Sequence, residues 1–137
     1  MSAKDTIHQA VKQALVKDGW VITHDPLTLE YEEVQVFVDL GAERVIAAEK
    51  AGEKIAVEVK SFLGPSLIRD IELALGQYVL YLSLLRKTDP DRRLYLAVSH
   101  VTYDGLFQGT AIQELLTENR VFTLVVNVTT EEIREWK

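Results

Sequence analysis

The segment from residue 54 to 62, KIAVEVKSF, constrains the fold of this chain more than any other. Its aliphatic residues alternate with other types at a period of two, which predicts a β-strand. Successive strand side chains point to opposite faces, so Ile55, Val57 and Val59 share one face while Glu58 and Lys60 share the other. Positions two apart on a strand are separated by about 6.6 Å. A carboxylate and an ammonium can therefore flank one bound group.

A second carboxylate, Asp39, lies in the apolar run VQVFVDL that precedes this strand. Two such strands can bring Asp39, Glu58 and Lys60 to one rim of a sheet. Carboxylates are the hard oxygen ligands that Mg²⁺ prefers, and a metal-bound water with a nearby lysine suits phosphodiester hydrolysis. We predict Asp39 and Glu58 as ligands of Mg²⁺ or Mn²⁺, and Lys60 as a catalytic residue. The alternative is a solvated strand face, since 26% of the residues are charged.

Composition limits the classes of protein to consider. A chain of 137 residues with 47% hydrophobic residues predicts one folded domain over residues 1–137. It has no cysteine, which excludes disulfides and thiolate metal sites. No apolar run approaches a membrane span, so we expect a cytoplasmic protein without membrane contact. The net charge of −6 argues against a surface that coats nucleic acid, but it leaves a local DNA site open.

Helices and strands are predicted to alternate around the central strand. Helices are expected over residues 2–18, 66–87 and 109–118, and strands over 20–25, 34–40, 44–50, 94–99 and 121–128. The acidic segment 29–33 is interpreted as a solvated loop, with a second metal site as the alternative. A capping box from Thr129 to Glu132 predicts a short final helix.

The long helix after the central strand carries more apolar residues than one buried stripe needs. The predicted buried stripe consists of Leu67, Ile71, Leu75, Tyr78, Leu82 and Leu85. Gln77 lies beside it, on a stripe with Asp70, Ala74 and Tyr81, and is either a site residue or an ordinary helix-flank amide. We expect the excess apolar surface, including Tyr78, Tyr81, Leu82 and Leu85, to lie in a protein interface.

Several charged residues are weaker candidates. Glu49 could reach the same rim as Glu58, although a cross-strand pair with a lysine is the alternative. His24 and Asp25 could be metal ligands or turn residues, and His100 follows a strand end. Residues 86–93 hold four cations that could contact a phosphate backbone, or could form a solvated loop.

The order of elements, with Asp39, the Glu58-Val59-Lys60 element and Gln77, resembles the PD-(D/E)xK nuclease superfamily. The resemblance implies an α/β fold with a restriction-endonuclease-like core, in which a central mixed β-sheet is flanked by helices. It also implies catalytic roles for Asp39, Glu58, Lys60 and Gln77, with Gln77 or Tyr81 directed at the site from the long helix.

Over essentially its whole length the chain is similar to the XisH family, the excision-controlling proteins of the fdxN DNA element in cyanobacteria. The similarity is carried by KDTIHQAVKQALVKDGWVITHDP, AVEVKSF, ALGQYVLYLSLL and VVNVTTEEIREW. It implies an accessory protein that acts with an XisI-like partner while a separate recombinase excises the element.

Two classes of function therefore remain open. We expect an accessory factor of DNA excision on a nuclease-like fold, with an XisI-like protein and DNA as partners and a homodimer as a further possibility. The alternative is an active Mg²⁺-dependent endonuclease. A third interpretation is a plain α/β interaction module with a solvated charged face.

Overall fold

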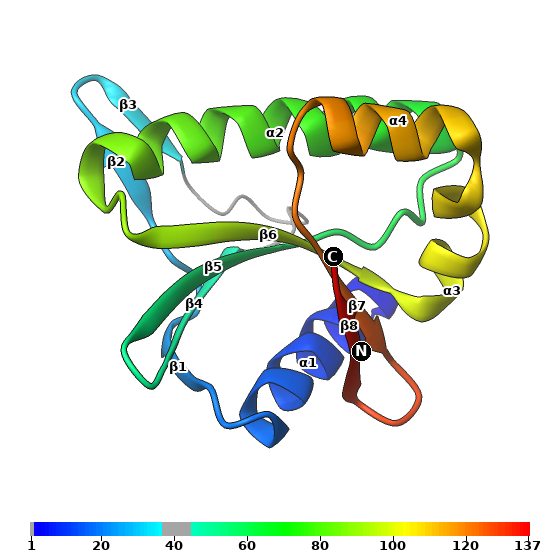
Figure 1. Ribbon diagram of the computed structural model, residues 1–137, viewed down its shortest axis with the longest axis horizontal. Coiled ribbons are helices and arrows are strands. Elements are labelled where there is room, and N and C mark those ends of the chain that lie inside the picture. The colour runs from blue at the N-terminus through cyan, green and yellow to red at the C-terminus, as the bar shows by residue number, and fades with distance from the viewer. Residues whose placement is uncertain (1, 37–44) are drawn as a thin grey trace.

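The computed structural model of the chain describes residues 2–36 and 45–137. Figure 1 shows a central sheet with helices on both of its faces. The helices are α1 (Ala3–Lys17), α2 (Leu67–Thr88), α3 (His100–Asp104), a 3₁₀ turn η1 (Leu106–Gln108) and α4 (Thr110–Glu118). The strands are β1 (Val21–His24), β2 (Leu29–Tyr31), β3 (Val34–Val36), β4 (Val45–Lys50), β5 (Glu53–Val59), β6 (Arg92–Ser99), β7 (Thr123–Asn127) and β8 (Glu132–Trp136).

The main sheet is mixed and has the strand order β1-β4-β5-β6-β7-β8. Strands β4 and β5 form an antiparallel hairpin, and β7 pairs with β8 in the same way. The pairs β5–β6 and β6–β7 are parallel. A parallel pair needs a crossover connection, and α2 provides the first while α3, η1 and α4 provide the second. The predicted α/β class with a mixed central sheet and flanking helices is confirmed.

Each face of the sheet packs against its own layer of helix. The aliphatic face of β5 contacts α1 in a cluster that includes Val11, Leu15, Ile55, Val57 and Val59. The opposite face packs under α2 and α4 in a second cluster, which includes Ala56 on β5 and Leu96 on β6. The strand periodicity of residues 54–60 therefore predicted correctly which side chains share the α1 face.

Side-chain caps fix the beginnings of the two long helices. The Ser2 hydroxyl accepts a hydrogen bond from the Asp5 amide, and the Ser66 hydroxyl accepts one from the Arg69 amide. Gly19 follows α1 with a φ of +93°, a conformation that glycine adopts without a steric penalty. The predicted boundaries of these helices agree with the structure to within a few residues.

The buried face of α2 differs in part from the prediction. Ile71, Tyr78 and Leu85 are buried as expected, but Leu67 is exposed and Ala74, Tyr81 and Leu84 are buried instead. Tyr78, Tyr81 and Leu85 thus lie in the core and are not available for the predicted interface. The apolar side chains that α2 leaves exposed are Leu67, Ile68, Leu73, Val79 and Leu80.

The interpretation of residues 29–33 as a solvated loop is wrong. Leu29–Tyr31 forms β2, which pairs antiparallel with β3 across a turn at Glu32 and Glu33. Glu32 has a φ of +52°, as a tight turn between paired strands requires. Leu29 is buried against the α2-side core, so one apolar residue holds an otherwise acidic strand in place.

The predicted final helix is also wrong, because residues 132–136 form strand β8. The Asn127 side-chain oxygen accepts hydrogen bonds from the Thr129 and Thr130 amides, which sets a turn where the capping box was expected. The chain then returns alongside β7, and Trp136 packs against Tyr95 with ring centroids 4.8 Å apart. Long-range pairing and aromatic packing thus override a local helix signal.

Two further features bear on function. Arg92 and Arg93, assigned to a turn-rich segment from the sequence, begin β6. Within the described ranges no helix has both the length and the apolar character that crossing a membrane requires.

Candidate active site

Glu58 lies near the end of β5, on the face of the sheet that α2 covers. It follows Ala56 at the strand period of two, and Ala56 belongs to the α2-side core. The side chain of Glu58 is only 1% exposed, although glutamate is among the residues least often buried. A buried carboxylate on a strand face is costly unless neighbouring groups or an ion stabilise its charge. Its burial is therefore the strongest structural sign of a site at this position.

Two tyrosines of α2 lie within electrostatic reach of Glu58. Burial raises the pKa of Tyr78 to about 12, and the negative charge of Glu58 adds to the rise. Burial and Glu58 together also raise the pKa of Tyr81 to about 12. The Tyr78 hydroxyl donates to the Leu94 carbonyl at 2.8 Å and accepts from the Phe122 amide at 3.2 Å. Both phenols therefore stay neutral beside the carboxylate at ordinary pH.

Lys60 follows the last residue of β5 and is half-buried. Its backbone amide donates to the Ala97 carbonyl of β6 at 3.1 Å, so the strand pairing extends to the lysine. Two residues later Phe62 has a φ of +54°, which is unfavourable for a bulky side chain. The Phe62 ring is buried edge-on against Phe107, which holds this backbone in place. Strained backbone of this kind concentrates at functional sites.

Gln77 lies in α2 and is half-buried, one residue before Tyr78. Its side-chain oxygen is buried and has no hydrogen-bond partner in the part of the chain that the structure describes. A buried amide oxygen without a partner costs about 1–3 kcal/mol, so such groups usually serve a ligand or an ordered water. The sequence placed Gln77 on one helix stripe with Ala74 and Tyr81, and both of these side chains are buried in the structure.

Of the two metal ligands predicted from the sequence, Glu58 lies among the residues that the structure describes and Asp39 does not. Asp39 lies outside the described residues, so its distance to Glu58 stays a prediction. Among residues 2–36 and 45–137 no group of three histidine, aspartate or glutamate side chains could hold a metal ion. The Glu58 carboxylate and the Gln77 amide oxygen are nevertheless the hard donors that Mg²⁺ or Mn²⁺ requires. The chemistry of these two donors therefore fits such an ion, and Asp39 is the further ligand that the sequence predicts.

Glu49 does not approach Glu58. In the β4–β5 register Glu49 is opposite Lys54, whereas Glu58 is opposite Val45. Four strand positions, about 13 Å, separate the two carboxylates along the sheet. Glu49 instead lies 4.0 Å from a guanidinium nitrogen of Arg92. The predicted pair with a lysine is not formed, because Lys54, which is opposite Glu49, contacts the Asp89 carboxylate at 2.6 Å.

The histidine candidates have structural contacts. His24 is exposed and bonds to Thr23, and the His100 ring accepts a hydrogen bond from the Val128 amide. Asp25 does not join His24 as a ligand pair. Its carboxylate contacts the Lys12 ammonium at 2.8 Å and a ring nitrogen of His8.

This His8–Lys12–Asp25 cluster was missed in the sequence analysis. Burial raises the pKa of the Asp25 carboxyl, but hydrogen bonds from Lys12 and His8 outweigh burial and leave the pKa below its usual value. The spacing of His8 and Lys12, four residues apart on one helix face, was a signal that could have identified the cluster.

Comparison with known proteins gives consistent matches over nearly the whole chain. A family model described as XisH protein matches residues 1–134. A crystal structure of an XisH family protein from Nostoc punctiforme is 47% identical, with 96% of this chain and 98% of that chain covered and a TM-score of 0.89. A crystal structure of an fdxN element excision controlling factor protein from Anabaena variabilis is 48% identical, with the same coverage and TM-score. No match is found among curated proteins.

Proposed function

This chain belongs to the XisH family, and we propose on that basis that it is a controlling factor for the excision of a DNA element. The observation that carries the proposal is the match to an excision controlling factor at 48% identity over 96% of the chain. An identity of this size over the full fold supports a shared role as well as a shared architecture. We further propose an XisI-like protein and DNA as its partners.

We propose that the control acts through a nuclease-like site of the PD-(D/E)xK type. Supporting observations are the buried Glu58 carboxylate, Lys60 at the end of the same strand and the Gln77 oxygen presented from α2. Asp39 and Glu58 would hold Mg²⁺ or Mn²⁺, which supplies charge neutralisation and a metal-activated water when bound. Lys60 would contact the phosphate and stabilise the negative charge that develops on it. The half-buried Lys60 side chain can reach such a phosphate from the rim of the sheet.

An excision assay tests the role directly. In cells that carry an fdxN-type element and lack their own XisH protein, we expect this chain to restore excision. Glu58→Gln and Lys60→Met should fail to restore it, because each removes a charge from the proposed site at nearly constant volume. Glu53→Gln is the matched control, since Glu53 is an exposed glutamate of the same strand. If the unmodified protein does not restore excision, the proposed role is contradicted. If Glu58→Gln restores excision fully, the Glu58 site is not needed for that role.

Active Mg²⁺-dependent DNA cleavage is the second candidate function, favoured by the burial of Glu58 on the strand that leads to Lys60. A metal that binds only the folded state stabilises it by about 1.4 kcal/mol at a tenfold excess over Kd. We expect millimolar Mg²⁺ or Mn²⁺ to raise the melting temperature of the unmodified protein and of Glu53→Gln.

Glu58→Gln and Asp39→Ala should each abolish this metal-dependent shift. Lys60→Met should retain the shift but lose any cleavage of supercoiled, linear or branched DNA, because the lysine acts on the phosphate. If neither ion changes the melting temperature, the protein does not bind these metals. Metal-dependent cleavage would then be rejected, and control of excision would be the one proposed function left.

A further inference from the structure

A groove of about 540 Å³ opens where the end of α2, the start of β6 and the segment between α4 and β7 meet. Four arginines line it, together with apolar residues and one acidic residue, Asp91: Arg86, Arg92, Arg93 and Arg120. The chain as a whole carries a net charge of −6. A local excess of positive charge on an acidic protein indicates a specific anionic ligand.

The four arginines have different roles in the groove. Arg92 is 8% exposed, and its guanidinium bonds to the Asp89 carboxylate at 3.0 Å and to the Ile55 carbonyl at 2.9 Å. It therefore belongs to the fold and forms part of the groove wall. Arg86, Arg93 and Arg120 are exposed, and across residues 2–36 and 45–137 none of them forms a salt bridge with a carboxylate. Their positive charges are available to a ligand.

An aromatic side chain, Phe122, lies beside one of these exposed arginines. Phe122 is 40% exposed, and the Arg93 guanidinium lies 5.0 Å from its ring centroid. The backbone of Phe122 is fixed, because its amide donates to the Tyr78 hydroxyl and its carbonyl accepts from the Leu96 amide. The Phe122 ring also packs against Tyr95, with ring centroids 6.0 Å apart. A partly exposed aromatic ring beside an arginine can stack a nucleobase, while further arginines contact the phosphates.

We propose that this groove binds a single strand of nucleic acid. Arg86 and Arg120 contact backbone phosphates, and the Phe122–Arg93 pair offers a surface on which a base stacks. An acidic peptide would use the positive charges but not the aromatic surface, so the combination favours a nucleic acid. The inference rests on the proposed function, in which DNA is a partner, and deepens it by naming the binding groove and the single-stranded form of the ligand. The groove needs neither a metal ion nor the Glu58 carboxylate.

The groove lies along the sheet from the candidate active site, about four strand positions from Glu58. Tyr78 lines the groove, and its phenol is also within electrostatic reach of Glu58. Along β5, the position of Lys54 opposite Arg92 is four residues from Glu58, about 13 Å. A nucleic-acid strand bound in the groove would therefore have to extend about 13 Å along the sheet to reach Glu58.

Binding of a labelled single-stranded oligonucleotide, followed by fluorescence anisotropy in the presence of EDTA, tests the proposal without metal or cleavage. We expect the unmodified protein to bind, with an affinity that falls as salt rises. The double variant Arg86→Ala/Arg120→Ala should bind more weakly, and its log–log salt slope should be smaller by about 1.4, or 0.7 for each lost phosphate contact. Phe122→Leu should weaken binding while leaving the salt slope unchanged.

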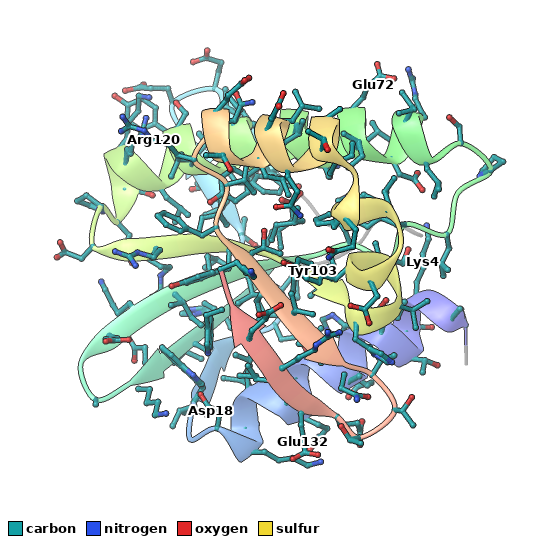
Figure 2. All side chains as sticks on the ribbon, turned by 45° about the vertical axis from the view of Figure 1, so that its right-hand side comes forward. Lys4, Asp18, Glu72, Tyr103, Arg120 and Glu132 are labelled. Carbon is teal, nitrogen blue, oxygen red and sulfur yellow. The ribbon has the colours of Figure 1, made fainter. Side chains whose placement is uncertain are left out.

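Arg69→Ala is the matched control, since Arg69 is an exposed arginine in the first turn of α2. Figure 2 places Arg120 and Glu72, which lies one turn beyond Arg69, at opposite ends of the helix layer. This variant should bind as the unmodified protein does. Circular dichroism checks that each variant folds.

The proposal would be overturned by no binding of the unmodified protein, by equal losses in Arg69→Ala and the double variant, or by tighter binding of the matching duplex. Equal competition by polyglutamate, charge for charge, would also reject a nucleic-acid groove. Excision in cells and the metal-dependent shift in melting temperature are measured in separate assays, so failure here is distinguishable from failure of the proposed function.

Discussion

Tyr81 reports on the environment of the Glu58 carboxylate. The tyrosine is buried in α2, and burial together with Glu58 raises its pKa from 10.0 to about 12. A group whose pKa is higher in the folded state stabilises the protein fully below its unfolded pKa. That stability is lost as the pH rises through the folded pKa. For Tyr81 the loss therefore falls between about pH 10 and pH 12, and it is on the order of 2 kcal/mol.

Tyr81→Phe should reduce the loss of stability in this alkaline window. The variant keeps the ring in the core but has no phenol to ionise, so its unfolding free energy should decline less steeply from pH 10 to 12. The decline should not vanish, because the pKa of Tyr78 is raised in the same way. Urea unfolding at several pH values measures the effect, with Tyr31→Phe as a control at an exposed tyrosine. If the unfolding free energy declines identically in the unmodified protein, Tyr81→Phe and Tyr31→Phe, the pKa of Tyr81 is not raised by folding.

The residues of the candidate site were only partly predictable from the sequence. The period of β5 predicted that Glu58 would share a face with Lys60 and oppose Ile55, Val57 and Val59. The near-complete burial of Glu58 could not be predicted, because it depends on which face of the sheet α2 covers. The hydrogen bond from Arg92 to the Ile55 carbonyl could not be predicted either, since it joins segments distant in sequence.

At the scale of elements, strong periodicity and caps gave correct predictions, whereas weak local signals did not. The helices that begin after Ser2 and Ser66 have both a cap and an apolar stripe, and each forms where expected. Strands β2 and β8 are short and charged, so their local sequence resembles a loop or a helix start. Each is held in place by a few buried contacts, at Leu29 and Trp136, that only the assembled fold provides.

At the scale of the whole molecule, the outer side of α2 is the surface where we expect the XisI-like partner to bind. Its exposed apolar residues replace the buried ones that the sequence suggested for this interface. Val79 is 59% exposed, so Val79→Lys should change the unfolding free energy by no more than about 0.5 kcal/mol. If the partner covers this surface, the variant should bind it at least about tenfold more weakly, a change of 1.4 kcal/mol.

Val101→Lys provides the control for this prediction. Val101 is 66% exposed on α3, and the substitution adds the same charge at a different surface. Isothermal titration against the partner should show a loss only for Val79→Lys. Sedimentation of the protein without the partner should show whether it forms a dimer, and sedimentation of Val79→Lys should show whether such a dimer uses the same surface. Equal affinities for the two variants would place the partner elsewhere.

The two open edges of the main sheet bear on how the protein avoids aggregation. Strand β1 has four residues, and its pairing with β4 shifts register between Ile22 and His24. Strand β8 carries Glu132, Arg134 and Glu135, and its pairing shifts register between Val125 and Val126. Short, irregular or charged edges are poor templates for a strand from another molecule. The sheet therefore resists growing by edge-to-edge addition, and contacts between molecules are directed to the helices and loops that cover its faces.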